Sequence, residues 1–374
     1  MKWVIPRGVQ KALEERKRAC AERSLVLRGD GIDLCSNDYL GISRALAAFA
    51  PVQDGTRARL GATGSRLVSG TTEVHESLEG ELAAFHETPT ALIFGSGYEA
   101  NIGLLGSLGS RHDTIIYDEL VHASMRDGIR LSNARSYSFR HNDVEDLVRK
   151  ISASRGDCFV AVESIYSMDG DRAPLQALCE VCERAGAFLI VDEAHGTGVC
   201  GPKGTGVVQE LGLAQRVYAR IHTFGKALGY RGAVVVGPRD LRDYLINFAR
   251  SFIYSTAPDL VTLEYIRHAY GLMQKAESER VALNVVIEET RAMREEFPRL
   301  SFLDSSSPIQ GVVIPSNEAV LAAESALIDA GYFVRGIRSP TVPKGSERMR
   351  ICLHSYNTSA QVRGALEVLS KVMQ

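Results

Sequence analysis

The strongest constraint on how this chain can fold is an alternation of short apolar runs with amphipathic stretches over its central part. The apolar runs cover residues 91–94, 114–117, 136–139, 159–162, 188–191, 217–222 and 233–236. Most of the intervals carry helical patterns, at residues 100–108, 123–131, 144–151 and 175–185. Such alternation predicts βαβ units, and unbroken apolar runs are typical of parallel strands buried on both faces. We therefore predict an α/β protein with a seven-stranded, mostly parallel sheet.

The flanking regions predict smaller parts. Residues 2–23 have an amphipathic helical pattern, and residues 31–41 are expected to form a short strand that runs into a turn. After the sheet come long helical stretches and then a mixed pattern, with strands at 311–314, 333–337 and 348–353 and helices at 318–330 and 360–372. We predict three ranges: an N-terminal helix and short strand (1–45), a large α/β domain (46–250), and a linking helix with a small C-terminal α+β domain (251–374). A chain of 374 residues, 45% of them hydrophobic, can bury cores of this size.

Composition excludes several classes of protein. The formal net charge is −2, and no run of like charge would suit a protein that wraps nucleic acid. The apolar stretches are too short to span a membrane, and the charged first helix is unlike a secretory signal, so we expect a cytoplasmic protein. Seven cysteines, an odd number, lie mostly in apolar segments and suggest free thiols. Cys179 and Cys182 lack a second pair of ligands, so we expect core packing and no metal site.

Polar residues gather where the predicted strands end. Ligands of open parallel sheets bind beyond the carboxyl ends of the strands, so these residues are candidates for a site. They are Gly97 and Tyr98, His122, Ser167, Asp192 and His195, and Thr223 and Lys226. The chain has 34 glycines, more than usual, and they also concentrate here and in the 61–70 segment, which we expect to be a loop at a binding site.

Pyridoxal phosphate is the cofactor that this set of residues suits. Its aldehyde needs a lysine such as Lys226 for a Schiff base, and its ring nitrogen needs a carboxylate such as Asp192. Its phosphate needs hydroxyls and a helix N-terminus, which the turn before residue 98 offers. A nicotinamide dinucleotide fold is the rival, but the third glycine of its motif is missing, and the motif of a nucleoside triphosphate loop is absent as well.

Five segments in order resemble the α-oxoamine synthases over nearly the whole chain. They are SNDYLG (36–41), GSRLVSGTTEVHESLE (64–79), SMDGDRAPL (167–175), VDEAHGTGVCG (191–201) and TFGKALG (223–229). That family consists of fold-type I pyridoxal phosphate transferases, which join an amino acid to an acyl thioester with loss of carbon dioxide. The resemblance implies that Lys226 forms the Schiff base, His122 stacks on the cofactor ring, Asp192 faces the ring nitrogen and His195 bonds the 3-hydroxyl.

The resemblance also implies a wider set of contacts. Gly97, Tyr98, Ser167 and Thr223 resemble residues beside the ring and the phosphate. Arg350 resembles the arginine that holds the amino acid carboxylate, a task that suits a bidentate guanidinium. Arg23 and Thr341 resemble residues that contact the acyl substrate, while Asn37 and Tyr39 are expected at the mouth of the site. The role of His75 stays open.

Four further segments resemble the branch of the family that makes 8-amino-7-oxononanoate for biotin synthesis. They are HNDV (141–144), FARSFIYST (248–256), SSPIQ (306–310) and TVPKGSERMR (341–350). The implied substrates are L-alanine and a pimeloyl thioester, on coenzyme A or on a carrier protein, and the family implies a homodimer. Alternatives are a 2-amino-3-ketobutyrate ligase, a serine palmitoyltransferase-like enzyme, or a non-catalytic protein with this fold. The segment 45–59, expected to be helical, is shorter than the resemblance suggests.

Overall fold

The computed structural model describes residues 4–27, 29–49 and 61–373. Its contacts divide the chain into two compact units. The sheet unit comprises 37–167 and 172–280, and the C-terminal unit comprises 1–36, 168–171 and 281–374. The three domain ranges expected from the sequence stay a prediction; the contacts join the N-terminal 36 residues to the C-terminal part and leave 251–280 with the sheet.

The sheet unit is built on seven strands in the order β2-β8-β7-β6-β5-β3-β4. Their bounds are β2 Thr90–Phe94, β3 Thr114–Asp118, β4 Arg135–Phe139, β5 Cys158–Glu163, β6 Phe188–Asp192, β7 Ala219–Thr223 and β8 Ala233–Gly237. Neighbours pair in parallel except at β8, which is antiparallel to both β2 and β7. The predicted seven-stranded, mostly parallel sheet is therefore confirmed.

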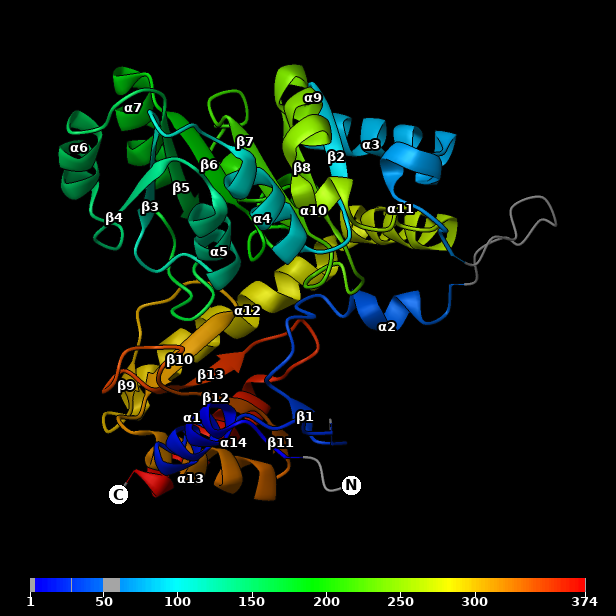
Figure 1. The fold of residues 1–374 in the computed structure, drawn as a ribbon. Helices are drawn as coiled ribbons and strands as arrows, with labels where there is room; N and C mark the ends of the chain where they lie inside the picture. The colour runs from blue at the N-terminus through cyan, green and yellow to red at the C-terminus, as the bar shows by residue number, and fades with distance from the viewer. Residues whose placement is uncertain (1–3, 28, 50–60, 374) are drawn as a thin grey trace. The chain divides into compact units, whose positions relative to one another are not determined.

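Helices connect and cover these strands (Figure 1). They are α2 Ile42–Leu46, α3 Glu73–Phe85, α4 Gly97–Ser107, α5 Ala123–Leu131, α6 Val144–Ser152, α7 Leu175–Ala185, α8 Val207–Glu210, α9 Arg239–Phe248, α10 Arg250–Ile253 and α11 Leu260–Lys275, with a 3₁₀ turn at Pro202–Gly204. The helix α4 packs against α5, α9 and α10 and against the strands β7 and β8. The helix α6 packs on α7, which in turn covers β6.

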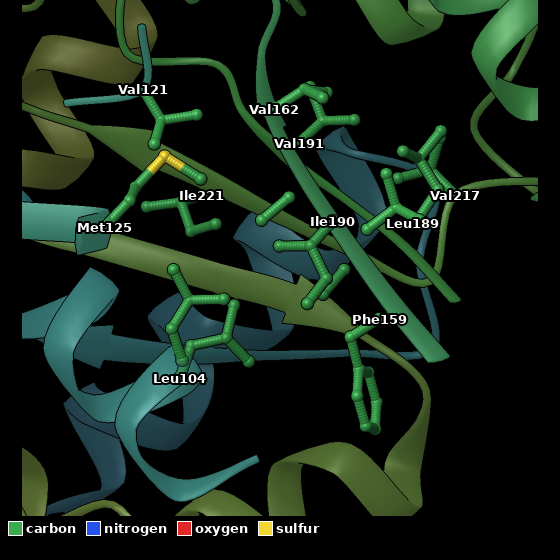
Figure 2. Close-up of a cluster of buried hydrophobic side chains, with 14 of the residues drawn as sticks. Leu104, Val121, Met125, Phe159, Val162, Leu189, Ile190, Val191, Val217 and Ile221 are labelled. Atoms are coloured by element: carbon green, nitrogen blue, oxygen red, sulfur yellow. The ribbon is translucent and has the colours of Figure 1, made fainter. Parts of the chain in front are cut away.

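The core of this unit lies between the α4–α5 layer and the middle strands of the sheet. Figure 2 shows Leu104 and Met125 from the two helices beside Val162, Val191 and Ile221 from three neighbouring strands. All five side chains are fully buried. Burial of this kind stabilises the fold by roughly 1.5–3 kcal/mol for each such side chain. The cysteines of α7, Cys179 and Cys182, are also buried, so their predicted role in core packing is confirmed.

The C-terminal unit has a four-stranded antiparallel sheet in the order β12-β13-β10-β9. The strands are β9 Ser301–Phe302, β10 Ile309–Val313, β12 Arg335–Ile337 and β13 Arg348–Cys352, and the helices are α1 Arg7–Arg18, α13 Asn317–Asp329 and α14 Ser359–Val372. A short parallel pair joins β1 Ile32–Asp33 to β11 Tyr332–Phe333. The helix α12 Glu277–Met293 leads into this unit, and a 3₁₀ turn, Arg294–Glu296, follows it. The predicted α+β character of this part is confirmed.

Local details differ from the sequence-based expectations. The first helix is shorter than 2–23: it begins after Pro6 and ends at Arg18, two residues before Cys20, whose φ of +48° is incompatible with a continuing helix. The glycine-rich segment expected to be a loop contains a π-helical turn, Arg66–Gly70. Of the expected helix at 45–59, only the end of α2 is seen, and residues 50–60 lie outside the described residues. Within the described part of the chain, no helix combines the length and apolar character that a membrane span requires.

Candidate active site

The polar residues predicted to gather at one rim of the sheet do follow its strands. The strands β3, β5, β6 and β7 are mutually parallel, so their carboxyl ends lie along one edge. His122 comes four residues after β3, Ser167 four after β5 and His195 three after β6, while Thr223 ends β7. Lys226 lies in the turn between β7 and the antiparallel β8. The topology thus brings the amine of Lys226, the imidazoles of His122 and His195, and the carboxylate of Asp192, which ends β6, to the same edge.

The turn that carries Lys226 is closed by its own backbone. The N–H of Phe224 donates to the carbonyl of Gly232 at 2.9 Å, and the N–H of Tyr230 donates to the carbonyl of Phe224 at 2.8 Å. Gly229 has φ +67° and lies directly against the backbone of Ser43, so a side chain there would collide with it. Glycine is needed at this point both for the positive φ and for the close approach.

Lys226 faces His195. The Nζ of Lys226 lies 2.6 Å from Nε2 of His195, and the other ring nitrogen of His195, Nδ1, lies 2.8 Å from the hydroxyl of Tyr39. That hydroxyl donates to Oδ1 of Asn37 at 3.0 Å. Tyr39 is 0% exposed, and its expected place at the mouth of the site stays a prediction. Asp38 accepts the backbone N–H of Ser43 and so anchors the turn that carries Tyr39.

Asp192 is buried at the end of β6 and is held from two sides. Its Oδ1 accepts the backbone N–H of Ala194 at 2.9 Å, and its Oδ2 accepts the side-chain amide of Asn101 at 2.7 Å. The same amide nitrogen lies 3.0 Å from Oγ of Ser124, and that Oγ lies 2.7 Å from Nδ1 of His122. A continuous hydrogen-bonded chain therefore connects the carboxylate of Asp192 to the imidazole of His122.

Glu163, the last residue of β5, binds the backbone of His122. Its Oε1 accepts the backbone N–H of His122 at 2.6 Å. Burial raises the pKa of Glu163 to about 8, and the neighbouring Asp192 carboxylate acts in the same direction. The pKa of His122 is lowered, mainly by loss of hydration and also by the Lys226 ammonium, while Asp192 opposes the shift. A histidine with a lowered pKa is kept neutral at physiological pH.

Three residues of the site were missed in the sequence: Asn101, Ser124 and Glu163. Asn101 is a fully buried polar side chain within the apolar helix α4, and such a residue needs partners. In the sequence, the one signal that could have singled it out is an amide residue within an apolar helical stretch. Ser124 and Glu163 are common types at helix starts and strand ends, so neither stands out without the fold.

The predicted cofactor turn lies at the start of α4. Ser96 caps this helix by accepting the N–H of Glu99, and a Cβ placed on Gly97 would come 3.2 Å from Oγ1 of Thr223. Tyr98 is half exposed and its hydroxyl donates to Asp127 at 2.7 Å, a bond that raises the tyrosine pKa. Ser167 is buried near the end of β5.

The three predicted substrate contacts Arg23, Thr341 and Arg350 belong to the C-terminal unit. Arg23 and Thr341 are both exposed there and are joined by a hydrogen bond of 3.1 Å from Nη2 to Oγ1. Arg350 lies in β13 between β10 and β12, is largely buried, and directs Nη1 to Sγ of Cys352 at 2.8 Å.

His75, whose role the sequence left open, caps α3. Its Nδ1 lies 2.9 Å from Oγ1 of Thr72, and its Nε2 lies 3.1 Å from the carbonyl of Pro258. Burial lowers its pKa to about 4, with Arg66 acting in the same direction. A neutral histidine that joins two segments of the sheet unit has a structural role.

The donor set of the rim fits pyridoxal phosphate. The amine of Lys226 could bond the aldehyde, and the buried carboxylate of Asp192, held by Asn101, could face a protonated ring nitrogen. The absence of a side chain at Gly97, with the Thr223 hydroxyl beside it, leaves room for a phosphate at the first turn of an 11-residue helix. Among the described residues, no group of three or more His, Cys, Asp or Glu side chains could hold a metal ion.

Comparison with known proteins agrees with this geometry. The family model of class I and II aminotransferases matches residues 29–369. An 8-amino-7-oxononanoate synthase of Emericella nidulans is 40% identical, with 98% of this chain and 95% of that protein covered.

Solved structures show the same fold. A serine palmitoyltransferase with a pyridoxal phosphate internal aldimine superposes with a TM-score of 0.87 at 25% identity, covering 98% of this chain and 96% of that one. An 8-amino-7-oxononanoate synthase from Francisella tularensis superposes with a TM-score of 0.77 at 29% identity, covering 91% of this chain and 97% of that one. The fold and the rim thus define a fold-type I transferase. The chain belongs to the aminotransferase class I and II family and, within it, to the α-oxoamine synthases, as its motifs predicted.

Proposed function

We propose that this protein is a pyridoxal-phosphate-dependent acyltransferase that condenses L-alanine with a pimeloyl thioester to give 8-amino-7-oxononanoate, coenzyme A or carrier thiol and carbon dioxide. The observation that carries the proposal is the placement of Lys226 2.6 Å from His195 at the strand edge that also holds Asp192. Relatives about 40% identical over nearly the whole chain bear the name of this synthase. The family and the solved structure with pyridoxal phosphate support the cofactor.

The bound cofactor would supply an electron sink for negative charge at the α-carbon of the amino acid. Lys226 would hold the cofactor and later take the α-proton on Nζ, with His195 Nε2 beside it as a hydrogen-bond acceptor. Asp192 would keep the proton on the ring nitrogen, and Asn101 would keep the carboxylate oriented toward it. His122, held by Glu163 and Ser124, would orient the ring and polarise the new carbonyl with its imidazole.

The remaining predicted residues complete the proposed site. Gly97, Tyr98, Ser167 and Thr223 would hold the ring and phosphate, and Asn37 would lie next to the amino acid. Arg350 would bind the amino acid carboxylate, and Arg23 with Thr341 would contact the acyl group; the hydrogen bond between Arg23 and Thr341 supports a shared role. Cytoplasmic localisation stays a prediction.

A homodimer is part of the proposal. The π-helical turn exposes Leu67 at 51% and Val68 at 83%, and Tyr254 is 72% exposed in the same unit. Apolar side chains so exposed support contact with another protein surface. Light scattering of the purified protein at several concentrations tests this, and a mass of one chain at all of them contradicts it.

A second candidate is a synthase of the same family that uses serine or glycine. It is supported by the serine palmitoyltransferase superposition, which has the higher TM-score of the two structures compared. The test is to incubate the loaded enzyme with each of L-alanine, glycine and L-serine, and with pimeloyl and palmitoyl coenzyme A, and to identify products by mass spectrometry. The proposal requires 8-amino-7-oxononanoate from alanine and the pimeloyl donor. Product only from serine or glycine would identify the second candidate, and no product with any pair would support a non-catalytic protein.

The acyl carrier is resolved by the same assay. Pimeloyl coenzyme A and a pimeloyl carrier protein are supplied in parallel at equal concentration, with L-alanine in excess. The donor with the larger kcat/KM is the preferred one, since that ratio measures discrimination between substrates.

A further inference from the structure

We propose that Tyr39 is a positioning residue that keeps the proton of neutral His195 on Nδ1, so that Nε2 presents its lone pair to Lys226. The role of Tyr39 in the reaction rests on the proposed function, whereas the tautomer of His195 does not. It assigns Tyr39 a role through His195 in place of contact with substrate.

The assignment follows from counting hydrogens. The hydroxyl of Tyr39 has one hydrogen, and it lies 3.0 Å from Oδ1 of Asn37 and 2.8 Å from Nδ1 of His195. An amide oxygen can only accept, so the hydroxyl hydrogen points to Asn37. The bond to His195 then needs its hydrogen from Nδ1, and a neutral imidazole with a proton on Nδ1 has a bare Nε2.

The contact to Lys226 agrees with this tautomer. The Nζ of Lys226 lies 2.6 Å from Nε2, and an ammonium can only donate. The three bonds therefore run in one direction, from Lys226 to His195 to Tyr39 to Asn37, and each donor strengthens the next. A proton that leaves the Lys226 ammonium can pass to Nε2, which gives an imidazolium whose Nδ1–H still donates to the Tyr39 oxygen and leaves a neutral amine.

Burial keeps this arrangement from exchanging with water. Tyr39 is 0% exposed and His195 is 3% exposed. The turn before α2 is fixed by Asp38, which accepts the N–H of Ser43, and by the bond from the Gly41 N–H to the Asp38 carbonyl at 2.9 Å. Tyr39 and Lys226 contact the His195 ring, and Asp192 and Glu193 are titratable groups on its own turn. His122 and Glu163 act electrostatically with Lys226 and Asp192.

The test removes only the hydroxyl, in Tyr39→Phe. We expect the loaded variant to fold, to lose about tenfold in kcat, the equivalent of one ordinary hydrogen bond, and to keep its KM for the amino acid within about twofold. The protonated His195 ring loses the acceptor of its Nδ1–H in this variant and is therefore less stable. The pH midpoint of the visible absorption of the bound cofactor should move down by about one unit as a result. A raised KM with an unchanged pH midpoint would overturn the proposal and return Tyr39 to substrate contact.

Tyr244→Phe is the matched control. It deletes another tyrosine hydroxyl of the sheet unit, which donates to the carbonyl of Ser107 at 2.6 Å, away from Lys226. A purely structural role for Tyr39 predicts that both variants change thermal stability alike and neither shifts the pH midpoint. That result would also overturn the proposal.

A measurement without substrate or cofactor separates this inference from the proposed function. The ¹⁵N chemical shifts of the His195 ring, assigned by comparison with His195→Gln in the cofactor-free full chain, report which nitrogen is protonated. We expect a protonated Nδ1 in the wild type and a mixture of tautomers in Tyr39→Phe. A wild-type ring protonated on Nε2 would refute the inference even if condensation is observed, and a protonated Nδ1 would uphold it even if condensation is not.

Discussion

The side-chain amide of Asn101 donates to Oδ2 of Asp192 across 2.7 Å, within the buried interior of the sheet unit. Because a carboxylate can only accept, this contact fixes which end of the Asn101 amide faces Asp192. The nitrogen also bonds Ser124, so the orientation of Asp192 depends on a residue of α4 and on one of α5. The carboxylate proposed to face the cofactor is therefore oriented by helix packing as much as by its own strand.

Replacing Asn101 should weaken cofactor binding. In Asn101→Leu the carboxylate of Asp192 loses a charge-assisted hydrogen bond, worth about 1.5–3 kcal/mol, so we expect cofactor affinity to fall about tenfold or more. Asn101→Asp should be worse, because it brings a second carboxylate to Asp192. Fluorescence titration of the cofactor-free protein measures both, and equal affinity in wild type and Asn101→Leu contradicts the role given to Asn101.

Lys226→Ala should abolish turnover and the visible absorption of the loaded protein. The reason is that the proposed bond to the cofactor and the acceptor of the α-proton are lost together. Lys275→Ala, an exposed lysine at the end of α11, is the control and should leave both unchanged. Retention of both properties in Lys226→Ala would remove the basis of the proposed function.

Glu163 should make stability depend on pH. Its pKa is raised from 4.5 to about 8, chiefly by burial, so the folded protein holds a proton that the unfolded chain releases. The free energy of unfolding contributed by this group therefore falls as the pH rises from about 4.5 to about 8. Urea unfolding of cofactor-free protein at pH 5 and pH 8 should show a smaller loss in Glu163→Gln than in the wild type. Glu145→Gln, an exposed glutamate of α6, should behave as the wild type does.

Gly196→Ala should destabilise the turn that carries His195. A Cβ at this position would collide with Oε2 of Glu193 and lie 3.0 Å from Oγ of Ser164. Both neighbours are fully buried and bonded to each other at 2.6 Å, so neither can withdraw easily. Overpacking of this kind costs about 1–3 kcal/mol, which thermal unfolding will detect. Gly212→Ala is a poor control because of its positive φ, whereas Gly80→Ala in α3 has open space and should be neutral or stabilising.

Much of the fold could be predicted because the strands of the sheet, apart from the exposed edge strand β4, are largely buried on both faces. Strands such as β6, Phe188–Asp192, consist of unbroken apolar runs that end at a polar residue, and both the run and its end are visible in the sequence. The direction of β8 could not be predicted, since periodicity carries no information about which way a buried strand runs. The segment with the π-helical turn Arg66–Gly70 is expected to be a loop, because glycine and serine are typical of turns and loops.

The site could be predicted in part. Lys226, Asp192 and His195 occur in motifs directly after strands, and the structure places Lys226 beside His195. The burial of Tyr39 was missed, because a tyrosine next to a turn gives no sign of which way its ring points. Asn101 was missed because its partner Asp192 is 91 residues away, and a contact of that range depends on how α4 packs on the sheet.

The closed backbone turn between β7 and β8 has a consequence for repeated turnover. Each end of the segment 224–232 continues into a strand of the same antiparallel pair, and a backbone hydrogen bond joins Phe224 to Gly232. A lysine on so short a tether cannot diffuse away when its amine is released. Its amine is then present at the reacting centre at an effective molarity far above any free amine in solution, so recapture after each cycle has little entropic cost.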